Sequence, residues 1–273
     1  MNSLQKLLEW LANLVELLGM AWPFLLQGAM YTVLFAAVSM VLGLILGFSV
    51  AVVRVTKVPV VSQIAAVYVS AFRGTPLLVQ IFVLYYGLPS VGIEFTPVTA
   101  GILALTLNVA AYLSESMRGA ILGIDKGQWE AGLSVGLTWG QTLWNIITPQ
   151  ALRLAVPSLS NSLISLIKDT SLISVITVTE LMLATKEVIA ETFQPLPLYL
   201  AAAGIYWLLS ADSVEKVAAS PCRWQNCSVS ERGGEQHDGA VTGRTAAPVL
   251  LVQPRRSRPG STPPAQHRPV PGS

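Results

Sequence analysis

The chain has 273 residues, of which 52% are hydrophobic and only 12% are charged. This composition excludes an ordinary soluble domain and a disordered chain, and it is typical of a polytopic membrane protein. Residues 1–210 hold nine basic and ten acidic residues, against eight and five in residues 211–273. Neither part has the concentrated positive charge of a nucleic-acid-binding protein, so we expect no nucleic acid partner.

Catalytic and metal-binding functions find little support in the residue types. All cysteines and histidines lie beyond residue 211: Cys222, Cys227, His237 and His267. The first 210 residues therefore offer no thiol nucleophile, no imidazole base and no ordinary zinc site, and a single C-x4-C is a weak metal or disulfide signal. No Walker-type phosphate loop is present. We expect a chain that is not an enzyme and that holds no metal or cofactor.

The first elements predicted are an interfacial helix and a membrane span. Leucines recur on one side of residues 4–18 and polar residues on the other, which predicts an amphipathic helix over residues 1–20 that contacts membrane lipid. The apolar run over residues 23–53 exceeds the ~20 residues that a bilayer requires. Its Gly43 and Gly47 have the G-x-x-x-G spacing that allows close helix packing, with a lipid-facing helix as the alternative.

Residues 59–88 are too long for one straight span, and four consecutive residues interrupt them: Arg73, Gly74, Thr75 and Pro76. Arg54 and Lys57, just before this segment, indicate a cytoplasmic position by the positive-inside rule. We therefore expect a helix near the cytoplasmic surface, a break, and a membrane helix through Tyr86. Arg73 is expected to hold the break by donating to backbone carbonyls.

Two further spans are predicted over residues 98–121 and 158–183, after an external loop that contains no Lys or Arg. They carry four polar or charged residues inside the membrane: Asn108, Glu115, Lys168 and Asp169. Such residues are costly in a bilayer and usually face a cavity or a partner, so they are candidates for a translocation pathway. The alternative is structural pairing, of Glu115 with Arg118 three residues on and of Lys168 with its neighbour.

A polar segment separates these two spans and contains two helix-start signals. Asp125 with Gln128, and Thr138 with Gln141, both fit the capping box. They predict two short helices with a break near Gly136, because glycine adopts a left-handed turn without steric cost. We expect Pro149 to limit the second helix. Nearby basic residues place the segment on the cytoplasmic side.

The last apolar run, residues 196–210, gives ~22 Å of helix against a ~30 Å hydrocarbon core. It crosses a bilayer comfortably only if it begins before Pro195 or continues past Ser210. Beyond Ser210 no apolar periodicity remains, which predicts a disordered tail over residues 211–273. Our hypothesis is that a shifted reading frame or an artefact replaced the end of this helix. A leucine-rich sequence in another reading frame of the encoding DNA, after codon 210, would support it.

Several stretches resemble a known family. The segment over residues 130–150 resembles the EAA loop of the membrane subunits of ABC importers, through Glu130, Ala131, Gly132, Gly136, Ile146 and Pro149. Gly132 stands where that pattern usually has its second alanine. The stretches FRGTPLLVQ (72–80) and TLNVAAYLSE (106–115) resemble the polar amino acid branch of the same importers. An ordinary amphipathic helical hairpin is the alternative interpretation of residues 130–150.

The resemblance implies an all-α permease subunit of about five transmembrane helices over residues 21–210, in a bacterial cytoplasmic (inner) membrane. Its implied partners are a second permease subunit, identical or different, two cytosolic ATP-binding subunits and an extracytoplasmic amino-acid-binding protein. The EAA loop would dock on the ATPase with Glu130 as its polar anchor, and a polar amino acid would cross by alternating access. The alternatives are an ion-coupled carrier or channel, with Glu115 and Asp169 as a proton relay, and a non-functional truncated permease.

Overall fold

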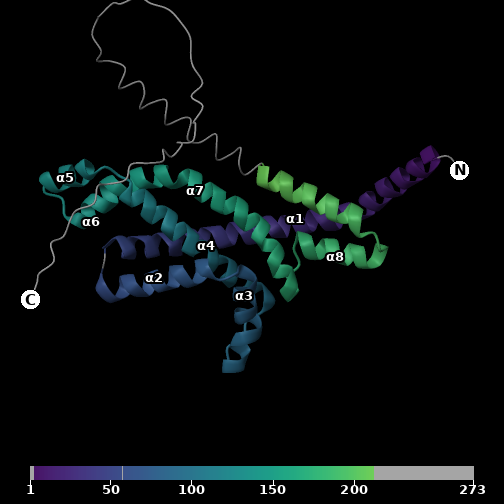
Figure 1. Ribbon diagram of the computed structural model, residues 1–273, viewed down its shortest axis with the longest axis horizontal. Coiled ribbons are helices and arrows are strands. Elements are labelled where there is room, and N and C mark those ends of the chain that lie inside the picture. The colour runs from purple at the N-terminus through teal and green to yellow at the C-terminus, as the bar shows by residue number, and fades with distance from the viewer. Residues whose placement is uncertain (1–2, 57, 212–273) are drawn as a thin grey trace, which may run out of the picture. The chain divides into compact units, whose positions relative to one another are not determined.

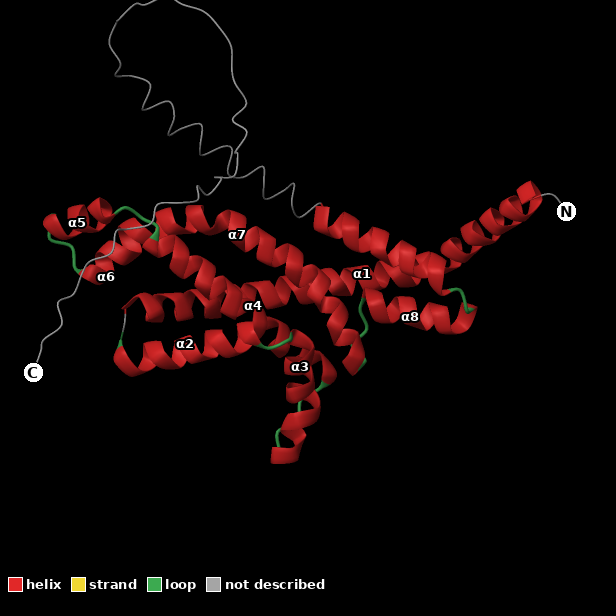
Figure 2. Cartoon of the chain, viewed as in Figure 1, coloured by secondary structure: helices red, strands yellow, loops and turns green. Residues whose placement is uncertain are grey.

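The fold is known from a computed structural model that describes residues 3–56 and 58–211, with side chains from residue 16 onward. Every regular element in this part of the chain is helical, which confirms the all-α prediction (Figures 1 and 2). The predicted tail lies outside the described residues, apart from Ala211, so its disorder and its origin stay predictions.

The helices follow one another with short connections. In chain order they are α1 (Ser3–Thr56), α2 (Pro59–Gly74), α3 (Leu77–Phe82), the π-helical turn η1 (Val83–Gly87), the 3-10 turn η2 (Leu88–Val91), α4 (Pro97–Leu122), α5 (Lys126–Ser134), α6 (Trp139–Thr142), the π-helical turn η3 (Leu143–Ile147), α7 (Thr148–Asp169), the 3-10 turn η4 (Thr170–Ile176), α8 (Leu181–Thr192) and a final helix, Pro195–Ala211.

Three helical stretches in the described chain are long and apolar enough to cross a membrane: Glu16–Thr56, Pro97–Leu122 and Trp139–Ile176. A fourth candidate is the pair α2 and α3, which is bent by 109° at a short break. The final helix begins at Pro195 and reaches Ala211, so it gains two residues over the predicted apolar run and gives ~26 Å of helix. It stays somewhat shorter than the ~30 Å core.

The first helix is continuous from Ser3 to Thr56, with Pro23 inside it. The expected interfacial helix over residues 1–20 is therefore not separated from the first span by a break. A long sequence of leucine, alanine and other good helix formers accounts for this continuity, because local propensity favours helix on both sides of the proline.

The core of the fold is the packing of α1 against α4, and two glycines allow it. A Cβ at Gly47 would lie 2.9 Å from the carbonyl oxygen of Ala110, and one at Gly43 would lie 2.5 Å from Val109 Cγ1. Only glycine leaves room for this approach. The interpretation of Gly43 and Gly47 as a helix-packing pair is thus confirmed.

The predicted fourth span, residues 158–183, extends too far at its end, because the helical stretch that could cross a membrane stops at Ile176. α7 ends at Asp169, η4 continues to Ile176, and the chain then turns at Thr177, which has a left-handed φ of 59°. Glu180 starts α8 by accepting a hydrogen bond from the backbone N–H of Leu183 at 2.9 Å. Hydrophobic periodicity did not reveal this turn, because apolar residues continue through it. The only local signal is the capping side chain of Glu180, and a single residue produces no periodic pattern.

The second half of the fold is anchored by α8, which packs on the first half of α1. Leu181 and Val188 are buried in one cluster with Leu25 and Ala29. Gly28 lets the two helices touch, since a Cβ there would lie 2.9 Å from the Cα of Leu181. Three charged residues lie on this helix: Lys186, Glu187 and Glu191.

Candidate functional site

The polar segment between α4 and α7 forms the predicted pair of short helices, α5 and α6. Gly136, with a left-handed φ of 89°, breaks them apart. The capping box at Thr138 is present. The Thr138 hydroxyl accepts a hydrogen bond from the backbone N–H of Gln141 at 3.3 Å, and the side-chain oxygen of Gln141 accepts one from the backbone N–H of Thr138 at 2.9 Å. The two-helix hairpin and one of its two start signals are therefore confirmed.

Two details of the hairpin differ from the prediction. Asp125 caps α5 by accepting from the N–H of Gly127 at 2.6 Å, and Gln128 pairs with Gln150 at 3.2 Å instead of closing a capping box. Pro149 does not end a helix. It lies in the first turn of α7, directly after the π-helical turn η3, and helix continues through it. The first turn tolerates proline because its N–H needs no helical partner, and a π turn relieves local crowding.

The structure explains why glycine stands at position 132, where the EAA pattern usually has alanine. A Cβ at this position would lie 2.6 Å from Thr142 Cγ2 and 3.1 Å from Ile146 Cδ1. Glycine therefore lets α5 lie directly against α6 and η3. Glu130 and Ala131, by contrast, are exposed on the outer surface of α5.

The hairpin also exposes apolar side chains. Val135 at the turn is 83% exposed, Leu133 is 47% exposed and Trp139 is 40% exposed. Trp129 stacks on Trp139 with ring centroids 5.4 Å apart, which holds the two short helices together. An apolar surface of this kind on a small polar hairpin is typical of a protein interaction site.

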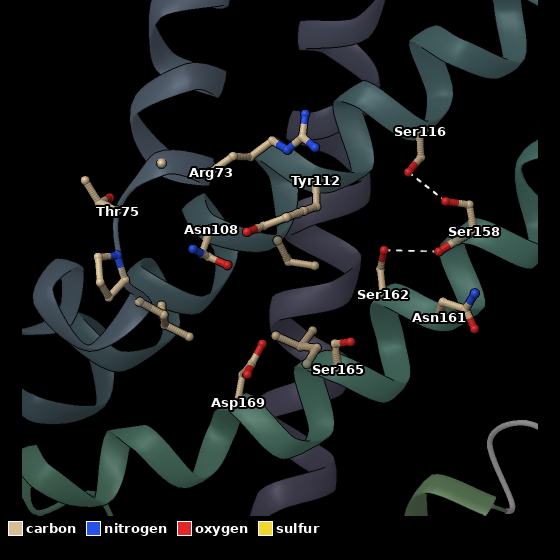
Figure 3. Close-up of a pocket in the computed structure, with 15 residues that line it drawn as sticks. Arg73, Thr75, Asn108, Tyr112, Ser116, Ser158, Asn161, Ser162, Ser165 and Asp169 are labelled. Carbon is tan, nitrogen blue, oxygen red and sulfur yellow. Dashed lines mark hydrogen bonds between the residues drawn. The ribbon is translucent and has the colours of Figure 1, made fainter. Parts of the chain in front are cut away.

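A cavity of about 730 Å³ lies between the α2–α3 break, α4 and α7 (Figure 3). Two of the four intramembrane candidates line it, Asn108 from α4 and Asp169 from the end of α7. All four residues of the predicted break line it as well: Arg73, Gly74, Thr75 and Pro76. The structure thus brings together motifs that are almost a hundred residues apart in the sequence.

The other two candidates lie elsewhere. Glu115 forms ion pairs with both Arg118 and Arg54, joining the ends of α4 and α1. It lines a smaller cavity of about 380 Å³, beside Arg73 and Gly74. Lys168 lines a separate groove against the final helix. The structure therefore shows the structural pairing considered for Glu115 with Arg118, and it adds Arg54, which the sequence did not indicate.

The break before α3 is held by Gln80, not by Arg73. The Gln80 amide donates to the carbonyl oxygens of Phe72 at 2.9 Å and Thr75 at 3.1 Å, and it accepts from Asn108 at 3.1 Å. The Arg73 guanidinium lies instead over the ring of Tyr112, 5.3 Å from its centroid. Gln80 is buried, so one amide satisfies the backbone that the break leaves unpaired.

Small polar side chains on α7 complete the cavity wall, and sequence reasoning missed them. Ser158, Asn161, Ser162 and Ser165 line it at intervals of three and four residues, the spacing of one helix face. Ser158 joins α7 to α4, because its hydroxyl donates a 2.7 Å hydrogen bond to the Ser116 hydroxyl (Figure 3). This polar face inside a predicted span was the signal available in the sequence.

A buried carboxyl group, Glu180, was also missed. Its side chain accepts a 2.7 Å hydrogen bond from the Tyr206 hydroxyl and lies 3.5 Å from the Thr32 hydroxyl. The same carboxyl group accepts a 2.9 Å hydrogen bond from the backbone N–H of Leu183. Glu180 ties α1, α8 and the final helix together at a distance from the cavity.

Known proteins resemble the chain in sequence. L-cystine transport system permease protein TcyB of Bacillus subtilis (strain 168) is 46% identical over 189 residues, covering 69% of this chain and 81% of that protein. Arginine transport system permease protein ArtQ of the same organism is 36% identical over 188 residues, covering 68% of this chain and 86% of that protein.

Solved structures share the fold. The crystal structure of an amino acid ABC transporter with histidines matches with a TM-score of 0.70 and 29% identity over 74% of this chain and 94% of that one. An inward-facing MetNI methionine ABC transporter matches with a TM-score of 0.60 at 20% identity, over 74% of this chain and 97% of that one. Residues 39–211 match the profile described as "binding-protein-dependent transport system inner membrane component". The chain belongs to this family of membrane transport components.

Proposed function

We propose that this chain is the permease subunit of an ATP-driven importer that moves a polar amino acid across a bacterial cytoplasmic membrane. The two relatives described above are transport system permeases for amino acids by name, and the cavity of about 730 Å³ is of the size that small-molecule sites have, ~300–1,000 Å³. The chain itself performs no catalysis in this proposal. It forms the passive pathway.

The observation that carries the proposal is the exposed hairpin of α5 and α6. Its two helices are held together by the Thr138 capping box and the stack of Trp129 on Trp139, so we expect the hairpin to move as one body. A partner that grips the exposed face around Glu130 and Val135 could displace the membrane helices as a unit. α7 continues from α6 through η3, and it carries the cavity wall. Motion of the hairpin would therefore reach the cavity directly.

This proposal assigns the partners. ATP-binding subunits would cover the hairpin on the cytoplasmic side, and an amino-acid-binding protein would deliver substrate on the other side. A second permease subunit, identical or different, would complete the pathway, because the polar face of α7 is poorly suited to lipid. Lipid would surround the apolar residues that the described chain leaves exposed on α1 and α2, such as Ile45 and Ile64.

The docking role is tested by co-purification with the ATP-binding subunit. Glu130→Lys reverses the charge on the exposed surface of α5, so we expect the complex to be lost. The matched control is Glu94→Lys, the same change at an exposed residue before α4, which should retain the complex. If the Glu130→Lys variant retains the ATPase as well as the Glu94→Lys variant does, Glu130 is not part of the interface.

Uptake into vesicles separates the transport mechanisms. We expect uptake that requires both ATP and the binding protein. Uptake driven by a proton gradient alone would support the ion-coupled carrier, and no uptake under either condition would support a non-functional truncated permease. The carrier alternative lacks a continuous relay among the described residues, because Glu115 is engaged by two arginines and lines a different cavity from Asp169.

A further inference from the structure

The root of the hairpin rests on the ends of two helices. Leu143 and Ile147, in the turn η3 that follows α6, are buried in an apolar cluster to which both α4 and α1 contribute. We call the contributing helix ends the seat of the hairpin, and they include Val52 and Val55 from α1 and Ala120 and Ile121 from α4. A movement of the hairpin can therefore act on both helices at once.

The hairpin reaches α1 through noncovalent contacts alone. It follows α4 directly in the chain and leads into α7 through η3, whereas α1 ends at Thr56, before α2 begins. Yet α1 runs from the seat to the other half of the fold, where Gly28 touches the start of α8. Gly28 and Val52 are ~36 Å apart along the helix at ~1.5 Å per residue. Whatever fixes α1 at the seat therefore decides whether a movement of the hairpin reaches α8.

An ion pair fixes α1 beside the seat. Arg54 lies between the seat residues Val52 and Val55 in the sequence. Its guanidinium donates to Oε2 of Glu115 on α4. The other carboxylate oxygen, Oε1, accepts from Arg118, whose Nε lies 3.1 Å away. The two arginines thus hold the same carboxylate, but the first link joins two helices and the second stays within α4.

The ion pair lies beyond the glycine contacts of α1. Gly43 and Gly47 bring α1 against α4, and the Cβ position of Gly47 is 3.2 Å from the backbone nitrogen of Ser114. Arg54 lies about two turns further along α1, where its side chain is 18% exposed against 27% for Glu115. Opposite charges that are partly shielded from water attract more strongly than charges at the surface. Without Arg54, the end of α1 would rest on the seat by apolar contacts, which are not directional.

We propose that Arg54 is a positioning residue, which makes α1 follow the hairpin through the ion pair with Glu115. The inference rests on the transport function proposed above, and it adds how a movement caused by the ATP-binding subunits reaches the distant half of the fold. A hairpin that moved without α1 would shift α4 and α7 against α8 instead of displacing the helices as a unit. ATP would then be hydrolysed with less transport.

The two arginines provide a matched pair of variants. Arg54→Gln removes the link between the helices, whereas Arg118→Gln removes the link within α4 and leaves the other in place. The importer is assembled in vesicles from this chain and the partners proposed above, and it is supplied with ATP and a radiolabelled mixture of the protein amino acids. The quantity measured is the amount of amino acid taken up per ATP hydrolysed.

We expect Arg54→Gln to lower this ratio by roughly 3- to 30-fold and Arg118→Gln to lower it by less than about twofold. Both variants should co-purify with the ATP-binding subunit, because neither changes the exposed surface of α5 and α6. A ratio that Arg54→Gln leaves unchanged, or that Arg118→Gln lowers as much, would overturn the proposal.

Exchange of the charges tests the pair itself. Arg54→Glu alone places two carboxylates together and should lower the ratio further than Arg54→Gln does. Adding Glu115→Arg restores an ion pair of reversed polarity, and Arg118→Gln is included so that the new arginine has no like charge one turn away. We expect this triple variant to return to within about threefold of the unaltered chain. A triple variant that is no better than Arg54→Glu would overturn the role of the pair.

Failure of this inference is separable from failure of the proposed function. ATP-dependent uptake by the unaltered chain, together with an unaffected ratio for Arg54→Gln, would reject the positioning role alone. The absence of ATP-dependent uptake by the unaltered chain would reject the transport role.

Discussion

At the scale of single residues, two buried polar side chains organise parts of the molecule that the apolar pattern does not explain. Gln80 satisfies the backbone at the α2–α3 break, and Glu180 joins α8 to the final helix through Tyr206. Both are buried, and both bond to groups that would otherwise be unpaired. Removing one partner from such a pair is costly because the other stays buried without a hydrogen bond.

This cost can be measured for Glu180 and Tyr206. We expect Tyr206→Phe and Glu180→Leu each to lower the free energy of unfolding by about 1–3 kcal/mol, because phenylalanine lacks the donor and leucine lacks the acceptor of the 2.7 Å hydrogen bond. The double variant should cost less than the sum of the two by about 0.5–3 kcal/mol, measured by unfolding in mixed micelles. Additive losses would show that the two side chains stabilise the fold independently.

The sequence could predict the hairpin but not these residues. The Thr138 cap depends on neighbours three residues apart, so local pattern is sufficient to find it. Glu180 and Thr32 are 148 residues apart, and no periodicity in either segment indicates their meeting. The same reason explains the missed pair of Arg54 and Glu115, whereas Arg118 with Glu115 was visible at a spacing of three.

At the scale of helices, packing depends on the close approach of helix backbones at small residues more than on large side chains. Gly47 packs on the backbone of α4, and Gly28 packs on the start of α8. Between membrane helices the hydrophobic effect adds little, so dispersion contacts between closely placed backbones supply much of the packing energy. This explains why small residues recur at the buried positions of α4, such as Ala104, Ala110 and Ala111.

A single methyl group tests this packing. Gly47→Ala would place Cβ 2.9 Å from the Ala110 carbonyl oxygen, which cannot rotate away, so α1 and α4 must separate. We expect a loss of about 1–3 kcal/mol in unfolding stability. Gly204→Ala is the matched control in the final helix, because nothing lies within 4 Å of its Cβ position. A stability of Gly47→Ala equal to that of the control would contradict the close approach.

Helix boundaries were predictable where one residue type fixes them and not where the chain turns within an apolar stretch. The span over residues 98–121 matches α4, because Pro97 and Gly123 flank a continuous apolar run. The end of the fourth span was placed seven residues too late, because Val178 and Leu181 continue the apolar character beyond the turn at Thr177. The bent pair was predicted at the correct residues, since Pro76 cannot continue α2.

At the scale of the whole molecule, the residues that carry the proposed function all precede Ala211. The hairpin and the cavity are both built from described residues between 58 and 211. The cavity could not be predicted as a site from sequence, because its walls come from three segments whose contact depends on the complete helix arrangement. Only its polar character was visible, in Asn108 and Asp169.

Removal of residues 232–273 provides a whole-molecule test. We expect a chain that ends at Glu231 to co-purify with the proposed ATP-binding subunit as well as the full chain does, because no residue of the hairpin is removed. Co-purification of the two lengths side by side decides this. A shortened chain that folds by circular dichroism but has lost the ATPase would assign the removed residues a part in the complex.

The polar face of α7 has a consequence for how cells must handle this protein. Ser158, Asn161, Ser162 and Ser165 border a cavity that is open on one side. Hydroxyl and amide groups exposed to hydrocarbon lack hydrogen-bond partners. If the second permease subunit proposed above covers this face, a newly inserted copy without it would resemble a damaged protein to membrane proteases. Its lifetime in the cell should depend on how closely its synthesis is matched to that of the second subunit.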